Sequence, residues 1–295
     1  EIGRSRPFQR REQRWVEPQG ERFLARRRHD QNLLVQRARV DHRLGIALAT
    51  QHHHQVGHHR RAPLVIFVHG GGWKRGDKKN ATGTDKVSHY TGLGYAFASI
   101  NYRPVPDARV EDQASDVAAA IAWLKDNASR LGFDGRRIVL MGHSAGAHLS
   151  ALVGTDPRYL RGAGLGMDDL AGVIPLDGAA YDVPRQISEG GQFMHDTYVQ
   201  AFGSDVDRQR DLSPTFHAAA PNAPAFLILH VQRKDGTDQS RALGRALERA
   251  GAGAEVRGFE GRGLQGHAEI NRKLGDPSYP ATPVVDAWLE KVFRR

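Results

Sequence analysis

The chain of 295 residues contains no cysteine, so disulfides, thiolate nucleophiles and cysteine-ligated metals are excluded. Long apolar runs are also lacking, because no stretch approaches the roughly 20 residues that a membrane-spanning helix needs. The one run that resembles a secretory signal, Leu44 to Ala49 behind Arg43, is shorter than a usual signal core and lies far from the first residue. We therefore expect a soluble, cytoplasmic protein with no membrane span.

Most of the chain has little excess charge of either sign. The formal net charge is +9, but residues 1–61 hold 14 arginines, no lysine and 6 acidic residues, which leaves 28 basic and 27 acidic residues in the remainder. The first 61 residues show little helix or strand periodicity, and we predict a solvated or loosely packed extension there. Two alternatives stay open: an arm that binds nucleic acid or another anionic surface, and a leader that is foreign to the natural protein.

Neither a metal nor a nucleic acid is the expected partner of this segment. Its histidine cluster could hold a metal in principle, but no carboxylate has the spacing that would complete a catalytic zinc site. Its arginines are not interleaved with aromatic residues, as they are in many nucleic-acid-binding modules. The clustered histidines are His52, His53, His54, His58 and His59. We predict no metal and no cofactor.

From residue 62 onward, short apolar runs alternate with longer helical patterns, which is typical of a mostly parallel sheet with helices on both faces. The runs are continuous, as buried parallel strands require. Helical spacing of apolar residues extends from Val117 to Leu124 and from Leu243 to Ala250, and a last helix is expected from Val284 to Val292. The predicted strands are Leu64 to His69, Ala96 to Tyr102, Arg137 to Gly142, Gly172 to Asp177, Ala225 to His230 and Ala254 to Phe259. We therefore predict one α/β domain over residues 62–295.

The segment GHSAG, from Gly142 to Gly146, stands between a predicted strand and a predicted helix. The run RIVLM precedes it, and a helical pattern over Ala145 to Val153 follows it. In this context a Gly-x-Ser-x-Gly motif forms a nucleophile elbow, in which a tight turn pushes the serine hydroxyl outward. We predict Ser144 as the nucleophile of a serine hydrolase.

A second glycine motif, HGGGW at residues 69–73, follows the run LVIFV. Attack of a serine on a carbonyl places negative charge on the carbonyl oxygen, which preset hydrogen-bond donors must stabilise. The backbone N–H of Ala145 is one predicted donor, and Gly70 and Gly71 are the candidates for the others. Such a loop could instead cradle a phosphate, but no Walker lysine-serine pair and no dinucleotide-binding spacing follow Gly72.

A serine nucleophile needs a base, which in this chain order is a histidine beyond the last strands. His267, in GRGLQGHAEIN, occupies that place, and we expect it in a glycine-rich loop. The base needs a carboxylate that fixes its tautomer. Our first choice is Asp235, which follows the strand before the last. Asp238, three residues on, and Asp177, at the end of the preceding strand, stay as alternatives.

Residues 178–212 break the rhythm of strands and helices, and they follow a strand end on the edge where open α/β sheets bind ligands. We predict a lid-like insertion here, with an ordinary long surface loop as the alternative. Its apolar and aromatic side chains, among them Tyr181 and Phe193, are expected to shape an acyl or aromatic pocket.

Residues 62–295 resemble the α/β-hydrolases of the esterase and lipase type, most of all the group that contains bacterial feruloyl-esterase-like carboxylesterases and kynurenine formamidases. The segments that carry the resemblance are HGGGW at 69–73, NYRP at 101–104, GHSAGAHLSALVG at 142–154, YVQAFG and LSP within 198–214, and GHAEIN at 266–271. The resemblance implies the roles given above to Ser144, His267 and the oxyanion residues. It also implies that Trp73 lines the pocket beside the oxyanion loop.

Two departures from the family pattern bear on the substrate. Kynurenine formamidases usually have a tyrosine where Gly72 stands, and hormone-sensitive-lipase relatives usually have an aspartate in place of His143. The sequence therefore predicts a carboxylesterase that acts on short- to medium-chain or aromatic esters as small-molecule substrates. Hydrolysis of aryl formamides is the second interpretation. A catalytically silent α/β-hydrolase used as a binding module is a third, from another class of function.

Overall fold

The computed structural model describes residues 35–37, 45–51, 61–79, 81–189, 191–219 and 221–294. These residues belong to one compact unit, Leu34–Arg295. The histidine cluster and most of the arginine-rich segment lie outside the described residues. Within the described ranges, no helix is long and apolar enough to cross a membrane.

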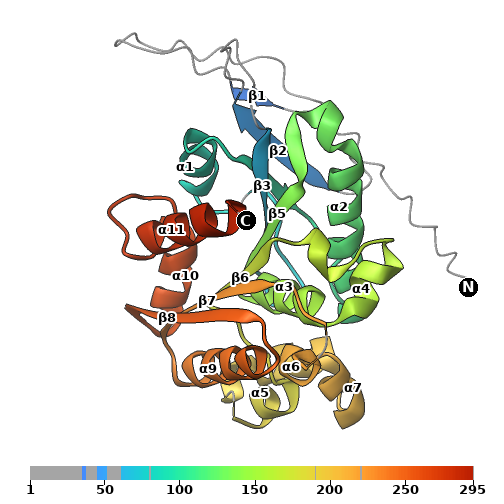
Figure 1. Ribbon diagram of the computed structural model, residues 1–295. Helices are drawn as coiled ribbons and strands as arrows, with labels where there is room; N and C mark the ends of the chain where they lie inside the picture. Colours follow the sequence, from blue (N-terminus) through green and yellow to red (C-terminus); the bar gives the residue numbers. More distant parts are fainter. Residues whose placement is uncertain are drawn as a thin grey trace, which may run out of the picture. The chain divides into compact units, whose positions relative to one another are not determined.

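A single sheet of eight strands forms the centre of this unit (Figure 1). The strands are β1 (Val35–Arg37), β2 (Ile46–Gln51), β3 (Ala62–Val68), β4 (Ala96–Ile100), β5 (Phe133–His143), β6 (Gly172–Leu176), β7 (Ala225–Gln232) and β8 (Gly253–Arg262). Their order in the sheet is β1-β2-β4-β3-β5-β6-β7-β8. The neighbouring strands from β4 through β3 to β8 are parallel. Strand β2 pairs antiparallel with both β1 and β4. The predicted mostly parallel α/β sheet is confirmed.

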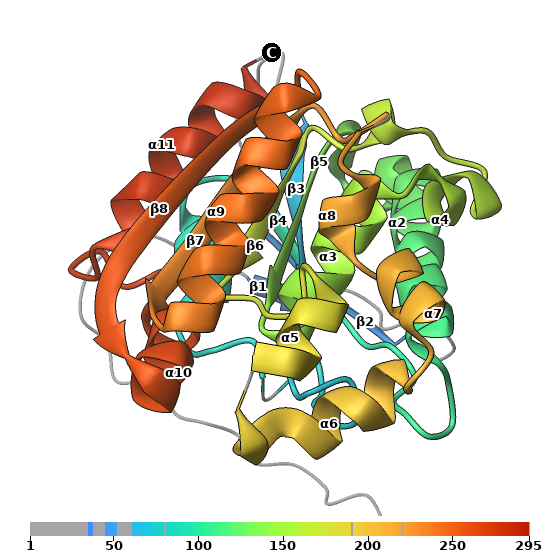
Figure 2. The same ribbon diagram turned by 90° about the horizontal axis from the view of Figure 1, so that it is seen from below.

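Helices cover both faces of the sheet. One face packs against α2 (Val110–Leu131), α3 (Ala145–Thr155) and α9 (Lys234–Arg249), and the other packs against α1 (Lys86–Gly92) and α11 (Ala281–Phe293). Figure 2 shows α11 on one side of the strands and α9, α3 and α2 on the other. The connections also carry α4 (Pro157–Gly162), a 3-10 turn (Met167–Asp169) and α10 (Gly263–Lys273).

Burial along β3 explains why its sequence is apolar without interruption. Leu64, Ile66 and Val68 face the core on the side of α2 and α3, while Val65 and Phe67 face the core on the side of α1 and α11, and all five are fully buried. A strand covered on both faces leaves no position for a polar side chain. At roughly 1.5–3 kcal/mol for each large apolar side chain, such burial dominates the stability of the sheet.

The sheet begins earlier in the chain than the predicted boundary at residue 62. Ile46 to Ala49 of β2 pair with β4, in a register that aligns Ile46 with Ile100, and the side chains of Ile46 and Leu48 are buried. Residues assigned to the basic extension therefore supply an edge of the sheet, and the boundary is corrected. Burial alternates along β2, as expected for an antiparallel strand with one covered face.

The six strands predicted after residue 62 correspond to β3 through β8, with different ends. The largest difference is in β5, which begins at Phe133 rather than Arg137. The insertion between β6 and β7 is helical, with α5 (Val183–Glu189), α6 (Gln192–Phe202), α7 (Val206–Asp211) and α8 (Pro214–His217). In the view of Figure 1, α5, α6 and α7 gather below the sheet.

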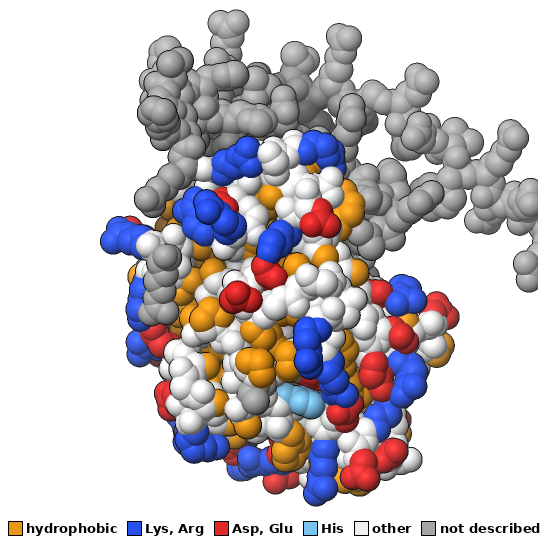
Figure 3. All heavy atoms as spheres, turned by 45° about the vertical axis from the view of Figure 1, so that its right-hand side comes forward, with side chains coloured by type: hydrophobic (Ala, Val, Ile, Leu, Met, Phe, Trp, Pro, Cys, Tyr) orange, Lys and Arg blue, Asp and Glu red, His pale blue; other side chains and the backbone are white. Residues whose placement is uncertain are grey.

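Charged side chains of both signs are mixed on the surface. On the face drawn in Figure 3, Lys and Arg side chains stand among Asp and Glu side chains around a cluster of hydrophobic ones. This mixing agrees with the near balance of charge after residue 61.

Candidate active site

Three neighbouring strands end side by side, and backbone hydrogen bonds continue past their ends. The N–H of Ser144, just after β5, donates to the carbonyl of Leu176 in β6 at 3.1 Å. The N–H of Asp177, just after β6, donates to the carbonyl of Leu229 in β7 at 2.8 Å. Ligand sites of parallel sheets form at these carboxyl ends. The sheet itself therefore fixes Ser144 and Asp177 next to each other.

Ser144 lies in the left-handed backbone region, with φ 56°, at the turn between β5 and α3. This conformation is costly for a residue with a side chain, so the surrounding structure must impose it. The flanking glycines permit the tight turn. A Cβ on Gly142 would overlap the carbonyl oxygen of Gly146, and a Cβ on Gly146 would overlap that of Val68 in β3. The turn has the strand-turn-helix context that the sequence motif predicts.

His267 links the serine to the carboxylate. Its Nδ1 lies 2.5 Å from Asp177 Oδ2, and its Nε2 lies 2.9 Å from Ser144 Oγ. A carboxylate can only accept, so Nδ1–H donates to Asp177, and Nε2 of the neutral ring accepts from the Ser144 hydroxyl. This arrangement can remove the serine proton as the hydroxyl attacks a carbonyl.

Asp177 is completely buried but well supplied with hydrogen-bond donors. Besides His267, the N–H of Val231 donates to Oδ1 at 3.0 Å, and Nε of Arg233 donates to Oδ2 at 3.1 Å. Burial alone would raise the pKa of this carboxyl group, but the hydrogen bond from His267, the charge of Arg233 and the Val231 N–H together lower the pKa to about 2. Asp177 is therefore an ionised carboxylate at neutral pH.

The structure does not bring Asp235, our first choice for the acid, to His267. Its Oδ2 instead accepts from Nε2 of Gln186 at 3.1 Å and lies 3.7 Å from Nη1 of Arg233. Asp238 pairs with Lys234 on the exposed side of α9. The structure instead brings Asp177, one of our two alternatives, to His267, because the donors converge on the end of β6 rather than on the first turn of α9.

His267 belongs to a helix, α10, and not to the glycine-rich loop that we expected. Two contacts fix this helix. His143 Nε2 donates to the His267 carbonyl at 2.9 Å, and the buried Lys86 Nζ donates to both the backbone and the side-chain oxygens of Asn271, one turn further along. Burial lowers the pKa of His143 well below its usual range, so its ring is neutral. His143 and Lys86 therefore anchor the helix that carries His267. No sequence motif predicted the contribution of Lys86.

Two of the predicted oxyanion residues, Gly70 and Ala145, lie beside Ser144. A Cβ on Gly70 would stand 3.0 Å from the Cβ of Ser144, so this stretch of backbone touches the serine. Gly71 has φ 131°, and a Cβ there would overlap the carbonyl oxygen of Arg75. Ala145 is the first residue of α3, and N–H groups in the first turn of a helix have no partner within the helix. The role of these backbone N–H groups as donors to an oxyanion at Ser144 stays a prediction.

Comparisons with known proteins support the fold and show similarity to esterases. The structure is similar to esterase B of Lactobacillus rhamnosis, with a TM-score of 0.66 and 22% identity over 84% of this chain and 79% of that one. It is also similar to the esterase Est2 of Thermogutta terrifontis, with a TM-score of 0.64 and 23% identity over 88% and 92% of the two chains. In sequence, the BD-FAE family model matches residues 53–163. Esterase LipC of Mycobacterium tuberculosis (strain ATCC 25618 / H37Rv) is 34% identical over 58% of this chain and 44% of LipC. This chain has the α/β-hydrolase fold, and its sequence is similar to those of esterases. It spans about half the length of the curated relatives it matches.

The aromatic residues that we expected in the substrate pocket of this α/β-hydrolase have other surroundings. Trp73 is only 2% exposed and packs edge-on against Tyr198 and Phe202 of α6. Tyr181 is fully buried, so it does not line an open pocket as predicted. Phe193 lies in α6, and its side chain is outside the described part of the structure. Trp73 therefore supports the oxyanion loop, and its role in binding substrate stays a prediction.

A buried histidine connects the predicted oxyanion loop to the helical insertion. Nε1 of Trp73 donates to Nδ1 of His148 at 3.2 Å, so the His148 proton is on Nε2, which donates to the Leu212 carbonyl at 2.8 Å. Burial lowers the pKa of His148 to about 4, which keeps the ring neutral. His148 stands four residues after Ser144, one helical turn along α3. This spacing in the sequence could have indicated that His148 lies on the same side of the helix as Ser144.

The insertion also contacts the oxyanion loop directly. A Cβ on Gly72 would stand 3.0 Å from Cγ2 of Thr197, and Lys74 Nζ donates to Oε1 of Gln200 at 3.4 Å. Both partners belong to α6. The predicted lid therefore packs on the loop that would hold the oxyanion.

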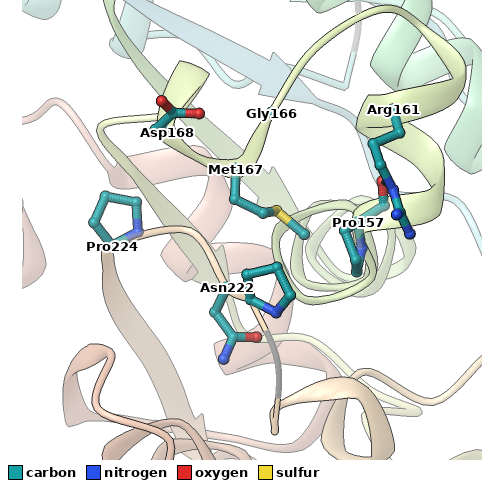
Figure 4. A pocket seen from close by; sticks show the side chains of 8 residues that line it. Pro157, Arg161, Gly166, Met167, Asp168, Asn222 and Pro224 are labelled. Atoms are coloured by element: carbon teal, nitrogen blue, oxygen red, sulfur yellow. Dashed lines mark hydrogen bonds between the residues drawn. The ribbon is translucent and has the colours of Figure 1, made fainter.

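An apolar cavity of about 520 Å³ lies elsewhere in the hydrolase (Figure 4). Met167 and Pro224, which line it, precede β6 and β7, so the cavity opens near the amino ends of these strands. Ser144 and Asp177 follow the carboxyl ends. We place the candidate active site at the carboxyl ends, because Ser144, His267 and Asp177 meet there and the cavity contains none of them.

Proposed function

We propose that this chain is a serine carboxylesterase that hydrolyses short- to medium-chain or aromatic carboxylic esters through an acyl-serine intermediate. The observation that carries the proposal is the continuous contact from Ser144 through His267 to Asp177. Ser144 is the nucleophile, His267 the general base and acid, and Asp177 the carboxylate that orients the imidazole. Backbone N–H groups of Gly70, Gly71 and Ala145 stabilise the oxyanion in this proposal.

The reaction begins when Ser144 Oγ forms a bond to the ester carbonyl carbon. The hydroxyl proton moves to His267 Nε2, and the carbonyl electron pair moves onto the oxygen. Each backbone donor to that oxyanion is typically worth about 2.7–4 kcal/mol of transition-state stabilisation. The imidazolium then returns the proton to the departing alcohol oxygen as the carbon–oxygen bond breaks. Water repeats the sequence on the acyl-serine, which releases the acid and restores Ser144.

Relatives named as esterases support the ester-hydrolysing part of the proposal. The proposed substrate range rests on the sequence motifs of this chain. It is not taken from the curated relatives, because the chain spans only about half of their length. Hydrolysis of aryl formamides is the second candidate and enters as an outcome of the test. It is disfavoured by Gly72, which stands where the formamidases usually have tyrosine.

The test is hydrolysis of p-nitrophenyl esters from acetate to decanoate, and of N-formylkynurenine, by wild type and Ser144→Ala. We expect serine-dependent ester cleavage that favours short chains, with kcat lowered by about 10⁴-fold or more in the variant. The matched control is Ser129→Ala, which removes an exposed serine of α2 and should keep wild-type kcat. Turnover by Ser144→Ala within tenfold of wild type would remove Ser144 from its proposed role.

Two further outcomes decide between classes of function. Preferential cleavage of the formamide would make the protein a formamidase. Labelling with a phosphonate, followed by mass spectrometry of the Ser144 peptide, tests the nucleophile without a guess about the substrate. If the protein shows no turnover and is not labelled, the result would support a catalytically silent binding module.

A further inference from the structure

A buried arginine holds the same carboxylate oxygen as His267. Arg233 follows β7 and precedes α9, and its side chain is 13% exposed. Its Nε donates to Asp177 Oδ2 at 3.1 Å, and its Nη2 donates to the Gly178 carbonyl at 3.0 Å. One guanidinium therefore holds both the side chain and the next backbone carbonyl of the proposed acid.

The surroundings of Arg233 fit the guanidinium closely. A Cβ on Gly236 would stand 2.8 Å from Nη2, so the first turn of α9 leaves space for this group. Burial disfavours the charged form, but the carboxylates of Asp177 and Asp235 outweigh it and raise the pKa of Arg233. The residue is a permanent buried cation between two carboxylates.

Asp177 needs such a cation for two reasons. A buried carboxylate is costly unless its charge is compensated, and a general base must accept the serine proton, so in the proposed reaction His267 does not supply that charge at the outset. Asp177 also has φ 44°, a left-handed conformation that persists only where the surrounding contacts impose it. The two hydrogen bonds from Arg233 act on the side chain and on the carbonyl of the following residue, so they meet both needs.

We propose that Arg233 is a positioning residue of the hydrolase, which keeps Asp177 ionised and its Oδ2 directed at His267 Nδ1. The inference rests on the proposed function of Ser144, His267 and Asp177. Arg233 touches no reacting atom and acts through Asp177. When the serine proton reaches His267 Nε2, the imidazolium faces a carboxylate whose charge and orientation are already fixed.

The test is a double-mutant cycle on ester hydrolysis by the full chain. Arg233→Gln should lower kcat by about 10- to 100-fold and change KM by less than about threefold, since a charge-assisted hydrogen bond to the acid is lost. Arg233→Lys keeps the charge without the two-pronged geometry and should recover part of kcat. In the Asp177→Asn background, Arg233→Gln should change kcat by less than about twofold, because its route of action is already removed.

The matched control is Arg241→Gln, which removes an exposed arginine of the same helix and should keep wild-type kcat and KM. An equal loss of kcat from Arg233→Gln in both backgrounds, or wild-type kcat in Arg233→Gln, would overturn the inference. If Arg233→Gln does not fold, Arg233→Lys in the two backgrounds completes the same cycle. Failure of the proposed function looks different, because wild type itself would then show no ester hydrolysis that depends on Ser144.

Discussion

The segments that follow β6 and β7 each carry an aspartate, Asp177 directly after β6 and Asp235 in the first turn of α9, and the two aspartates have opposite surroundings. Asp177, after β6, is fully buried and accepts hydrogen bonds from a histidine, an arginine and a backbone N–H. Asp235, after β7, is partly exposed and accepts from the amide of Gln186. The role of a carboxylate therefore follows from the donors that converge on it, and not from the strand that it follows.

The largest effect that separates the two aspartates is expected on kcat. Asp177→Asn should lower kcat by about 10⁴-fold, because an amide no longer enforces the tautomer in which Nε2 accepts the serine proton. KM should change little, since Asp177 is buried away from any ligand. Ester kinetics of the purified variant measure this, with circular dichroism to show that the fold is kept. Activity within tenfold of wild type would mean that another group orients His267.

Acid should reveal the same difference as a loss of stability. The pKa of Asp177 is lowered from 3.8 to about 2 in the folded state. A lowered carboxyl pKa contributes stability above the unfolded-state pKa, and this contribution disappears as the pH falls from about 4 towards 2. It amounts to about 2 kcal/mol of the free energy of unfolding. Urea unfolding between pH 5 and pH 2 should show this loss in wild type, and a smaller one in Asp177→Asn; parallel pH profiles would contradict the assignment.

The smallest effect is expected at Asp235 in the first turn of α9. Asp235→Asn keeps an oxygen that can accept from Gln186, so kcat should stay within about threefold of wild type and the free energy of unfolding should fall by about 1 kcal/mol or less. The same ester assay and urea titration measure both quantities. A loss of kcat comparable with that of Asp177→Asn would restore Asp235 as the acid.

The sequence predicted the strands from β3 onward because buried parallel strands leave long apolar runs. It also predicted the elbow at Ser144, since overlapping backbone atoms there demand glycine on both sides. It did not distinguish Asp177 from Asp235, because the choice depends on Arg233 and Val231, which reach Asp177 only in the folded sheet. Strand β2 was missed because its short alternation is flanked by arginine and histidine.

Other expectations depended on packing that a sequence does not display. Trp73 and Tyr181 are aromatic residues of a predicted pocket, yet both are buried against neighbouring elements. The helix that carries His267 was mistaken for a loop because glycine is common around it, while its anchor, Lys86, lies 185 residues away from Asn271 in the chain. The cytoplasmic location and the lack of a nucleic-acid partner stay predictions.

The hydrogen bonds from Ser144 to β6 and from Asp177 to β7 bear on how this protein unfolds on heating and on which substitutions it tolerates. Because the spacing of Ser144 and Asp177 is part of the sheet ladder, local fraying of the helical insertion does not alter it. Heating should therefore abolish the proposed triad and the fold at one midpoint. In evolution, substitutions on the outer surface of the insertion should leave the distance between Ser144 and Asp177 unchanged, because backbone hydrogen bonds of the sheet set that distance.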